Sequence, residues 1–200
     1  MMSALPESLL TPQEYLARER RAETKSEYLR GEVFAMTGAS RQHNLIAGNV
    51  AAELHQRLRD RPFEIYQSDM RVKVSPTGLY TYPDVTVVCG EPEFEDAQVD
   101  TLLNPKVLVE VLSPSTADYD RGRKFTHYRR LSSLHEYLVI SQDRPLVEHY
   151  VRQGQDAWVL TEERSLQAAV DLPSIDCQLP LSEIYLKVRF SEEDAPNGHA

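Results

Sequence analysis

Residues 106–113 constrain the fold more than any other part of the sequence. Their letters, KVLVEVLS, are almost continuously apolar and β-branched, which is typical of a strand covered on both faces. Such a strand needs a layer of structure on each side of its sheet. The segment therefore favours a layered α/β architecture.

The segments on either side of this strand show helical and strand periodicities in turn. In chain order they predict a capped helix (11–22), a hairpin (26–36), an amphipathic helix (40–59), a strand with one solvent-exposed face (70–75), a second strand (79–89), the covered strand (106–113), a helix (113–131), a buried strand (136–141) and C-terminal hairpins. The central order of helix, three strands, helix and strand indicates an α/β sandwich with a mixed sheet.

The composition is that of a soluble globular protein, with 41% hydrophobic and 26% charged residues. No stretch approaches the ~20 apolar residues that a membrane span requires, and the first residues do not have the pattern of a secretory signal. The two cysteines form no CxxC motif, which argues against a disulfide framework or a cysteine-built zinc site. We expect a cytoplasmic protein with one domain over residues 1–190 and a disordered acidic tail at 191–200.

The net charge of −9 argues against a simple nucleic-acid coat protein, because phosphate binding depends on Lys and Arg. Acidic residues concentrate at 90–100, at 161–163 and in the tail, whereas basic residues concentrate at 18–25 and 121–130. Without the acidic tail and the acidic loop at 90–100, the rest of the protein would be nearly balanced in charge and would carry basic patches. The overall charge does not identify a partner.

Two carboxylates stand where strands would bury them. Glu110 lies inside the apolar run at 107–112, and Asp84 follows Pro83 inside the predicted strand at 79–89. A buried carboxylate is costly unless it is paired, protonated or bound to a metal. A lone Glu110 would favour a salt bridge and a lone Pro-Asp pair a turn, but two carboxylates on adjacent strands can share one hard divalent cation.

At these residues the chain resembles the PD-(D/E)XK nuclease superfamily, and more closely its restriction-endonuclease-like family of the Uma-two type. The similar segments cover most of residues 11–140 and are TPQEYL, EYLRGEVFAMTGASRQHNLIAGNV, YPDVTVV, LVEVLSPSTADYDRGRKFTHY and HEYLVI. The resemblance implies an αβββαβ core with a mixed sheet flanked by helices, to which this chain adds an N-terminal helix and hairpin and a C-terminal β extension.

The resemblance also implies the site. Asp84 and Glu110 match the two acidic residues of the motif, whose lysine is replaced by Leu112 at the usual position. Lys124 in the following helix is the matching candidate, and its alternative interpretation is a solvated basic residue.

Further residues in the similar segments are candidates for supporting roles. Glu32 or Glu27 is a candidate third carboxylate, although an exposed position on the hairpin is the better interpretation of Glu27. His43 is either a supporting residue or a satisfied core or capping histidine. Arg121 and Arg123 are candidates for contacts with a phosphodiester backbone.

These residues lead to three hypotheses. The first is a metal-dependent endonuclease, acting on DNA, in which Mg²⁺ or Mn²⁺ is held by Asp84 and Glu110 and assisted by Lys124. The second is a catalytically degenerate nucleic-acid-binding or assembly protein, and the third is a hydrolase of small phosphate esters. A homodimer through the hairpins around Trp158 is a further expectation that rests on analogy.

Overall fold

A computed structural model describes residues 9–113 and 117–190. The acidic tail predicted at 191–200, and residues 114–116 at the start of a predicted helix, lie outside this range. The elements, in chain order, are α1 (Pro12–Glu19), β1 (Ser26–Leu29), β2 (Glu32–Ala35), α2 (Arg41–Leu58), β3 (Phe63–Gln67), β4 (Arg71–Val74), β5 (Leu79–Thr81), β6 (Val85–Cys89), β7 (Thr101–Leu102), β8 (Val107–Val111), η1 (Tyr119–Lys124), α3 (Phe125–Tyr128), β9 (Glu136–Ile140), β10 (Val147–Gln153), β11 (Ala157–Glu163), β12 (Ala169–Leu172), η2 (Pro173–Ile175), β13 (Cys177–Pro180) and α4 (Leu181–Ile184).

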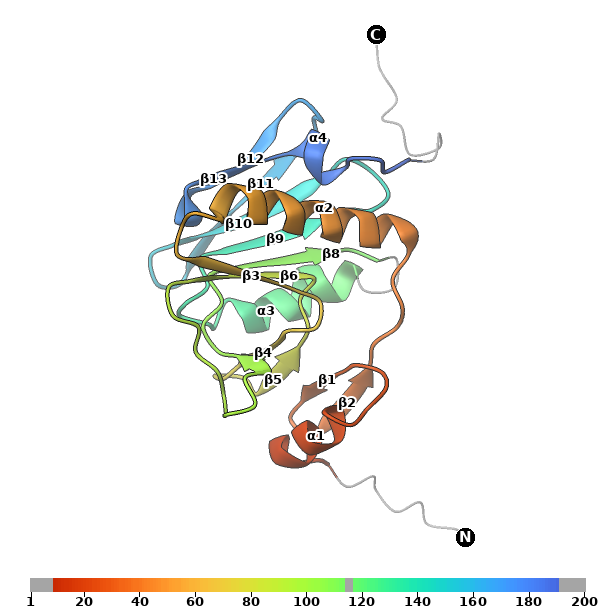
Figure 1. Ribbon diagram of the computed structural model, residues 1–200, viewed down its shortest axis with the longest axis vertical. Coiled ribbons are helices and arrows are strands. Elements are labelled where there is room, and N and C mark those ends of the chain that lie inside the picture. The colour runs from red at the N-terminus through yellow and green to blue at the C-terminus, as the bar shows by residue number, and fades with distance from the viewer. Residues whose placement is uncertain (1–8, 114–116, 191–200) are drawn as a thin grey trace.

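The strands form two main sheets and a separate hairpin. The larger sheet has the order β11-β10-β9-β8-β6-β3, the smaller has the order β2-β1-β5-β4-β7, and β12 pairs with β13. In Figure 1, α2 and the β12–β13 hairpin lie over one face of the larger sheet, and α3 and the smaller sheet lie on the other. The predicted α/β class with a mixed sheet is confirmed, since β8 and β9 run parallel while the other neighbours in the larger sheet run antiparallel.

Strand β8 separates the two parts of the hydrophobic core. Val107, Val109 and Val111 pack in the cluster under α2, whereas Leu108 packs in the cluster that contains Tyr128 of α3. Because side chains alternate along a strand, Glu110 points to the same side as Leu108. The core thus directs this carboxylate toward α3 and the smaller sheet.

The strand predicted at 79–89 is two strands in different sheets. Strand β5 ends at Thr81 in the smaller sheet, and β6 begins at Val85 in the larger one. Pro83 lies in the break, where a residue without a backbone N–H cannot continue a ladder. The prediction of a single strand is wrong, and the break places Asp84 directly before β6.

The prediction that the strand at 70–75 has one solvent-exposed face is also wrong. Arg71 of β4 is 4% exposed and donates to the hydroxyl groups of Tyr82 and Thr101 at 2.9 and 3.0 Å. Its guanidinium also lies 5.8 Å from the centre of the Tyr15 ring. Helix α1 covers this part of the sheet, which polar alternation along a single strand does not reveal.

The N-terminal helix and hairpin agree with their predictions. Helix α1 begins with the predicted capping box, in which the side chains and backbones of Thr11 and Glu14 bond reciprocally. The turn between β1 and β2 has positive φ at Arg30 and Gly31, as a two-residue hairpin turn requires. The hairpin joins the smaller sheet through the pairing of β1 with β5.

Two further features bear on the predictions. Among the described residues, no helix has the length and apolar character needed to cross a membrane. Trp158 in β11 packs within its own chain, where Arg152 lies 4.5 Å from its ring centre and Phe125 meets it edge-on. The homodimer expected around Trp158 stays a prediction.

Candidate nuclease site

Asp84 lies opposite Glu110 across two neighbouring strands. Val85 pairs with Val109 in the antiparallel β6–β8 ladder, so the same register extended by one residue sets Asp84 against Glu110. Residues that oppose each other in this way have Cα atoms about 4.5–5.5 Å apart. The expectation of carboxylates on adjacent core strands holds for Glu110, which lies within β8, whereas Asp84 lies immediately before β6 and not in a strand.

The side chain of Asp84 is 15% exposed and contacts groups from two elements. One oxygen, Oδ2, accepts a hydrogen bond from the backbone N–H of Val111 at 2.7 Å and lies 3.2 Å from Nε2 of His43. His43 stands in the first turn of α2, whose N-cap Ser40 accepts from the backbone N–H of His43. The cap thus fixes the start of the helix that brings the imidazole to Asp84.

Glu110 is buried and held by its other neighbours. Its Oε1 accepts a hydrogen bond from the Tyr128 hydroxyl at 2.7 Å and lies 2.9 Å from Nζ of Lys124. Burial raises the pKa of Glu110 to about 8, with Lys124 acting to lower it and the charges of Asp120 and Asp84 acting to raise it. A further positive charge placed beside such a carboxyl group stabilises its ionised form and lowers its pKa.

Lys124 is buried, and its ammonium contacts three carboxyl groups. Its ammonium lies 2.9 Å from Glu110, 3.1 Å from Glu27 and 3.5 Å from Asp120. Although burial lowers it, the charges of these carboxylates hold the pKa of Lys124 well above its usual value. The interpretation of Lys124 as a solvated basic residue is wrong, because its side chain is 6% exposed.

The local helix geometry explains how Lys124 reaches the cluster. Element η1 is a six-residue π-helix, Tyr119–Lys124, in which hydrogen bonds link residues five apart. Tyr119 and Lys124 are five positions apart, and the ammonium lies 5.9 Å from the centre of the Tyr119 ring. The wide turn thus gathers both residues on one side of the helix, toward Glu27.

Glu27, and not Glu32, is the hairpin carboxylate at the site. Glu27 of β1 is 8% exposed, so its interpretation as an exposed hairpin residue is wrong. Its Oε1 accepts from Thr81 of β5, and its Oε2 accepts from Tyr119 at 3.1 Å. Glu32 is exposed, because it lies on β2, which is the edge strand of the smaller sheet.

The charge in the cluster suits a hard cation. Glu110, Glu27 and Asp120 surround one ammonium, and the charge of Asp84 acts on Glu110. These four residues form an acidic cluster in which negative charge is in excess. Mg²⁺ is usually bound through one or two carboxylates, with water and substrate oxygens completing its coordination. Asp84 and Glu110 could supply two such carboxylates, whereas no group of three or more His, Cys, Asp or Glu that could hold a metal ion occurs among the described residues.

The two candidate phosphate-binding arginines differ in their surroundings. Nε of Arg121 donates to Glu148 at 2.6 Å, so this guanidinium is partly engaged within the protein. Arg123 is exposed on the same π-helix. Arg123 is therefore the more available of the two for contact with a phosphate.

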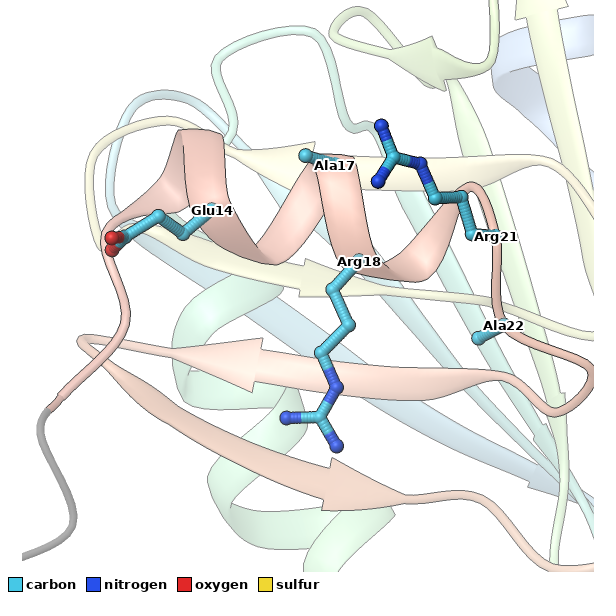
Figure 2. A pocket seen from close by; sticks show the side chains of 5 residues that line it. All are labelled: Glu14, Ala17, Arg18, Arg21 and Ala22. Carbon is cyan, nitrogen blue, oxygen red and sulfur yellow. The ribbon is translucent and has the colours of Figure 1, made fainter.

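Basic residues also line two surface hollows that Asp84 and Glu110 do not line. One is bordered by Arg129, Arg130, Asp156 and Trp158. The other lies along α1, where Figure 2 shows the guanidinium groups of Arg18 and Arg21 pointing away from each other. Since they do not converge, we assign no ligand to this second hollow.

Sequence reasoning missed several groups that support the site. Asp120, Tyr119 and Tyr128 all lie within the segment that resembles the family, and their spacing from Lys124 is the signal that could have identified them. A helical repeat places Asp120 and Tyr128 four residues from Lys124, on its own face. Thr81 carries no comparable local signal, because only the pairing of β1 with β5 brings it to Glu27.

Known proteins resemble this chain in sequence and in fold. Two proteins of Synechocystis, the uncharacterized proteins sll1609 and slr1290, are 40% and 33% identical over 171 and 181 residues, which cover 86% and 90% of this chain and 97% and 94% of those proteins. The crystal structure of "a putative nuclease belonging to DUF820" from Anabaena variabilis shares the fold at a TM-score of 0.70 and 18% identity, over 90% of this chain and 98% of that one. The sequence profile of the Uma2 family, described as "Putative restriction endonuclease", matches residues 12–182. With this match spanning both sheets and every residue of the acidic cluster, the chain belongs to the Uma2 family of restriction-endonuclease-like proteins.

Proposed function

We propose that this protein is a metal-dependent endonuclease that hydrolyses phosphodiester bonds in DNA. The observation that carries the proposal is the opposition of Asp84 and Glu110 at the end of two core strands, beside the buried ammonium of Lys124. Membership of a nuclease-like family and the shared fold support it. Function depends on the site rather than the fold, so the proposed chemistry depends on these side chains.

Asp84 and Glu110 would hold the cation through carboxylate oxygens. A bound Mg²⁺ or Mn²⁺ would polarise a phosphate oxygen and lower the pKa of an attacking water. Glu110 must lose its proton to act as a ligand, and its neighbour Lys124 favours that ionised form. Tyr128 keeps the carboxylate oriented through the hydrogen bond to Oε1.

Lys124 contributes positive charge and not a proton acceptor. Its ammonium stays protonated because the surrounding carboxylates raise its pKa. A fixed cation beside the scissile phosphate stabilises the charge that builds up on phosphate oxygens in the transition state. Exposed Arg123, on the same π-helix, would contact the phosphate backbone of the nucleic acid.

The test compares the wild-type protein with the double variant Asp84→Asn/Glu110→Gln. Each is titrated with Mg²⁺ or Mn²⁺ while thermal unfolding is followed, and parallel reactions contain supercoiled plasmid. We expect metal stabilisation and nicking in the wild type and neither in the double variant. The control is Glu23→Gln/Glu32→Gln, which replaces the same number of carboxyl groups at exposed positions and should behave as the wild type.

The outcomes separate the candidate functions. Nicking that persists undiminished in the double variant would exclude Asp84 and Glu110 as the catalytic carboxylates. Stabilisation by metal without nicking would favour hydrolysis of a small phosphate ester, which the net charge of −9 tolerates better than it tolerates DNA. A panel of nucleotide esters tests that candidate directly. Absence of both signals would favour the degenerate binding protein.

A further inference from the structure

The geometry points to Glu27 as a positioning residue: its carboxylate holds the Lys124 ammonium in place beside Glu110. This inference rests on the proposed function for its catalytic meaning, but the contact it concerns can be measured without activity. It assigns a role in the site to the N-terminal hairpin, which lies outside the two strands that carry Asp84 and Glu110.

The Lys124 ammonium lies between carboxylates of the two sheets. Glu110 contacts the ammonium from the larger sheet at 2.9 Å, and Glu27 contacts it from the smaller sheet at 3.1 Å. A lysine side chain is long and rotates freely about four carbon–carbon bonds. One carboxylate fixes its direction poorly, whereas two carboxylates on different rigid elements restrict the ammonium to the space between them.

Both carboxylate oxygens of Glu27 accept hydrogen bonds. Thr81 donates to Oε1 from the neighbouring strand, and Tyr119 donates to Oε2 at 3.1 Å from the π-helix. A buried carboxylate with both oxygens engaged has little freedom to move. Glu27 can therefore transmit the rigidity of the smaller sheet to Lys124.

Glu27 and Glu32 differ in burial, since Glu27 is buried and Glu32 is exposed. Both glutamates lie on the same hairpin, and Glu32 pairs with Leu29 across it. Burying Glu27 carries a desolvation cost that an exposed position would avoid. The ion pair with Lys124 offsets that cost only while the hairpin, the π-helix and the larger sheet stay in register.

A double-mutant cycle tests the inference through activity. The variants are Glu27→Gln, Lys124→Met and their combination, with Glu32→Gln as the control on the same hairpin. If Glu27 acts through Lys124, Glu27→Gln should slow plasmid nicking about tenfold in the wild-type background but less than about twofold in the Lys124→Met background. Equal losses in both backgrounds would mean that Glu27 acts independently of Lys124, and would overturn the inference.

A second readout does not depend on nuclease activity. The Lys124 ammonium, shielded from water exchange, should give its own cross-peak in ¹H–¹⁵N spectra of the metal-free protein, assigned by its loss in Lys124→Met. We expect this cross-peak to shift or disappear in Glu27→Gln and to stay unchanged in Glu32→Gln. An unchanged cross-peak in Glu27→Gln would overturn the inference even if the wild type fails to nick DNA, whereas a shifted one would support it while the proposed function fails.

A milder variant keeps the test valid if Glu27→Gln does not fold. Tyr119→Phe removes the hydrogen bond to Oε2 and leaves the carboxylate in place. It should shift the same cross-peak and slow nicking by only about two- to fivefold, because Glu27 keeps its contact with Lys124 and loses one of the groups that orient it. No change in either readout would count against the inference.

Discussion

Glu110 is buried and has a raised pKa. Its ionisation therefore lowers the free energy of unfolding by an amount that depends on pH. In the unfolded chain the carboxyl group has an ordinary pKa near 4.5, whereas in the folded, metal-free protein burial raises it to about 8. Between these values the folded state keeps a proton that the unfolded state has lost. The free energy of unfolding therefore decreases as the pH rises through this window.

Replacing Glu110 by Gln should remove this dependence. We expect Glu110→Gln to match the wild type at about pH 4.5 and to exceed it at about pH 8 by an amount on the order of a few kcal/mol. Urea unfolding at several pH values in the presence of a chelator measures the difference. Glu32→Gln, at an exposed position, should follow the wild-type curve throughout, and a gap for Glu110→Gln that does not vary with pH would contradict the prediction.

At the scale of elements, Arg152 of β10 links α3 to the larger sheet. Its guanidinium donates at 2.6–2.9 Å to the backbone carbonyl groups of Leu131, Leu134, Arg129 and Gln155. It also lies over the Trp158 ring at 4.5 Å. The turn after α3 thus depends on one side chain for several of its hydrogen bonds, and α3 follows directly on the element that carries Lys124.

Removal of this guanidinium should destabilise the protein. Arg152→Met leaves partly buried carbonyl groups without their charged donor, and we expect a loss of about 2–3 kcal/mol in the free energy of unfolding. Denaturant unfolding provides the measurement. The matched control is Arg164→Met, whose exposed ion pair with Glu162 should contribute less than about 1 kcal/mol. Equal effects of the two substitutions would show that Arg152 is not a structural link.

Individual elements differ in how far the sequence determines them. Helix α2 could be predicted almost to its ends, because Ile46, Val50 and Leu54 mark one buried stripe. The break between β5 and β6 could not be predicted, because the sequence around Pro83 is compatible with one continuous strand as well as with two strands. Strand β3 was not anticipated, and its pattern of partly exposed residues lacks the alternation that identifies a strand.

The candidate site shows the same division. Asp84, Glu110 and Lys124 could be chosen as candidates because each conflicts with its local context or matches a motif, and their roles stay predictions. The choice of Glu27 over Glu32 could not be made, because both flank one turn and only the packing of β1 against β5 distinguishes them.

At the scale of the whole molecule, a net charge of −9 opposes the binding of a polyanion. The acidic cluster adds a local repulsion at the place where a phosphate would sit. In the metal-free protein this repulsion should weaken DNA binding more than an equal charge elsewhere on the surface. A bound cation would remove it.

This reasoning predicts that Asp84→Asn/Glu110→Gln binds DNA more tightly than the wild type when no divalent metal is present. We expect a gain of roughly three- to tenfold at about pH 9, where Glu110 is ionised in the wild type. Fluorescence anisotropy of a labelled duplex in EDTA measures the affinity. The control Glu23→Gln/Glu32→Gln changes the net charge equally, and an equal gain in that variant would show that only total charge matters.

The acidic cluster draws its members from both sheets, and this has a consequence for how the protein acquires its chemistry during folding. Glu27 and Tyr119, which are hydrogen-bonded at the site, are separated by 92 positions in the chain. Contacts between such distant segments require the closure of a long loop, which delays them relative to local hairpins and helices. A chain in which only one sheet has formed lacks the cluster, so any hydrolytic competence that the cluster confers should emerge last, as the final stage of chain maturation.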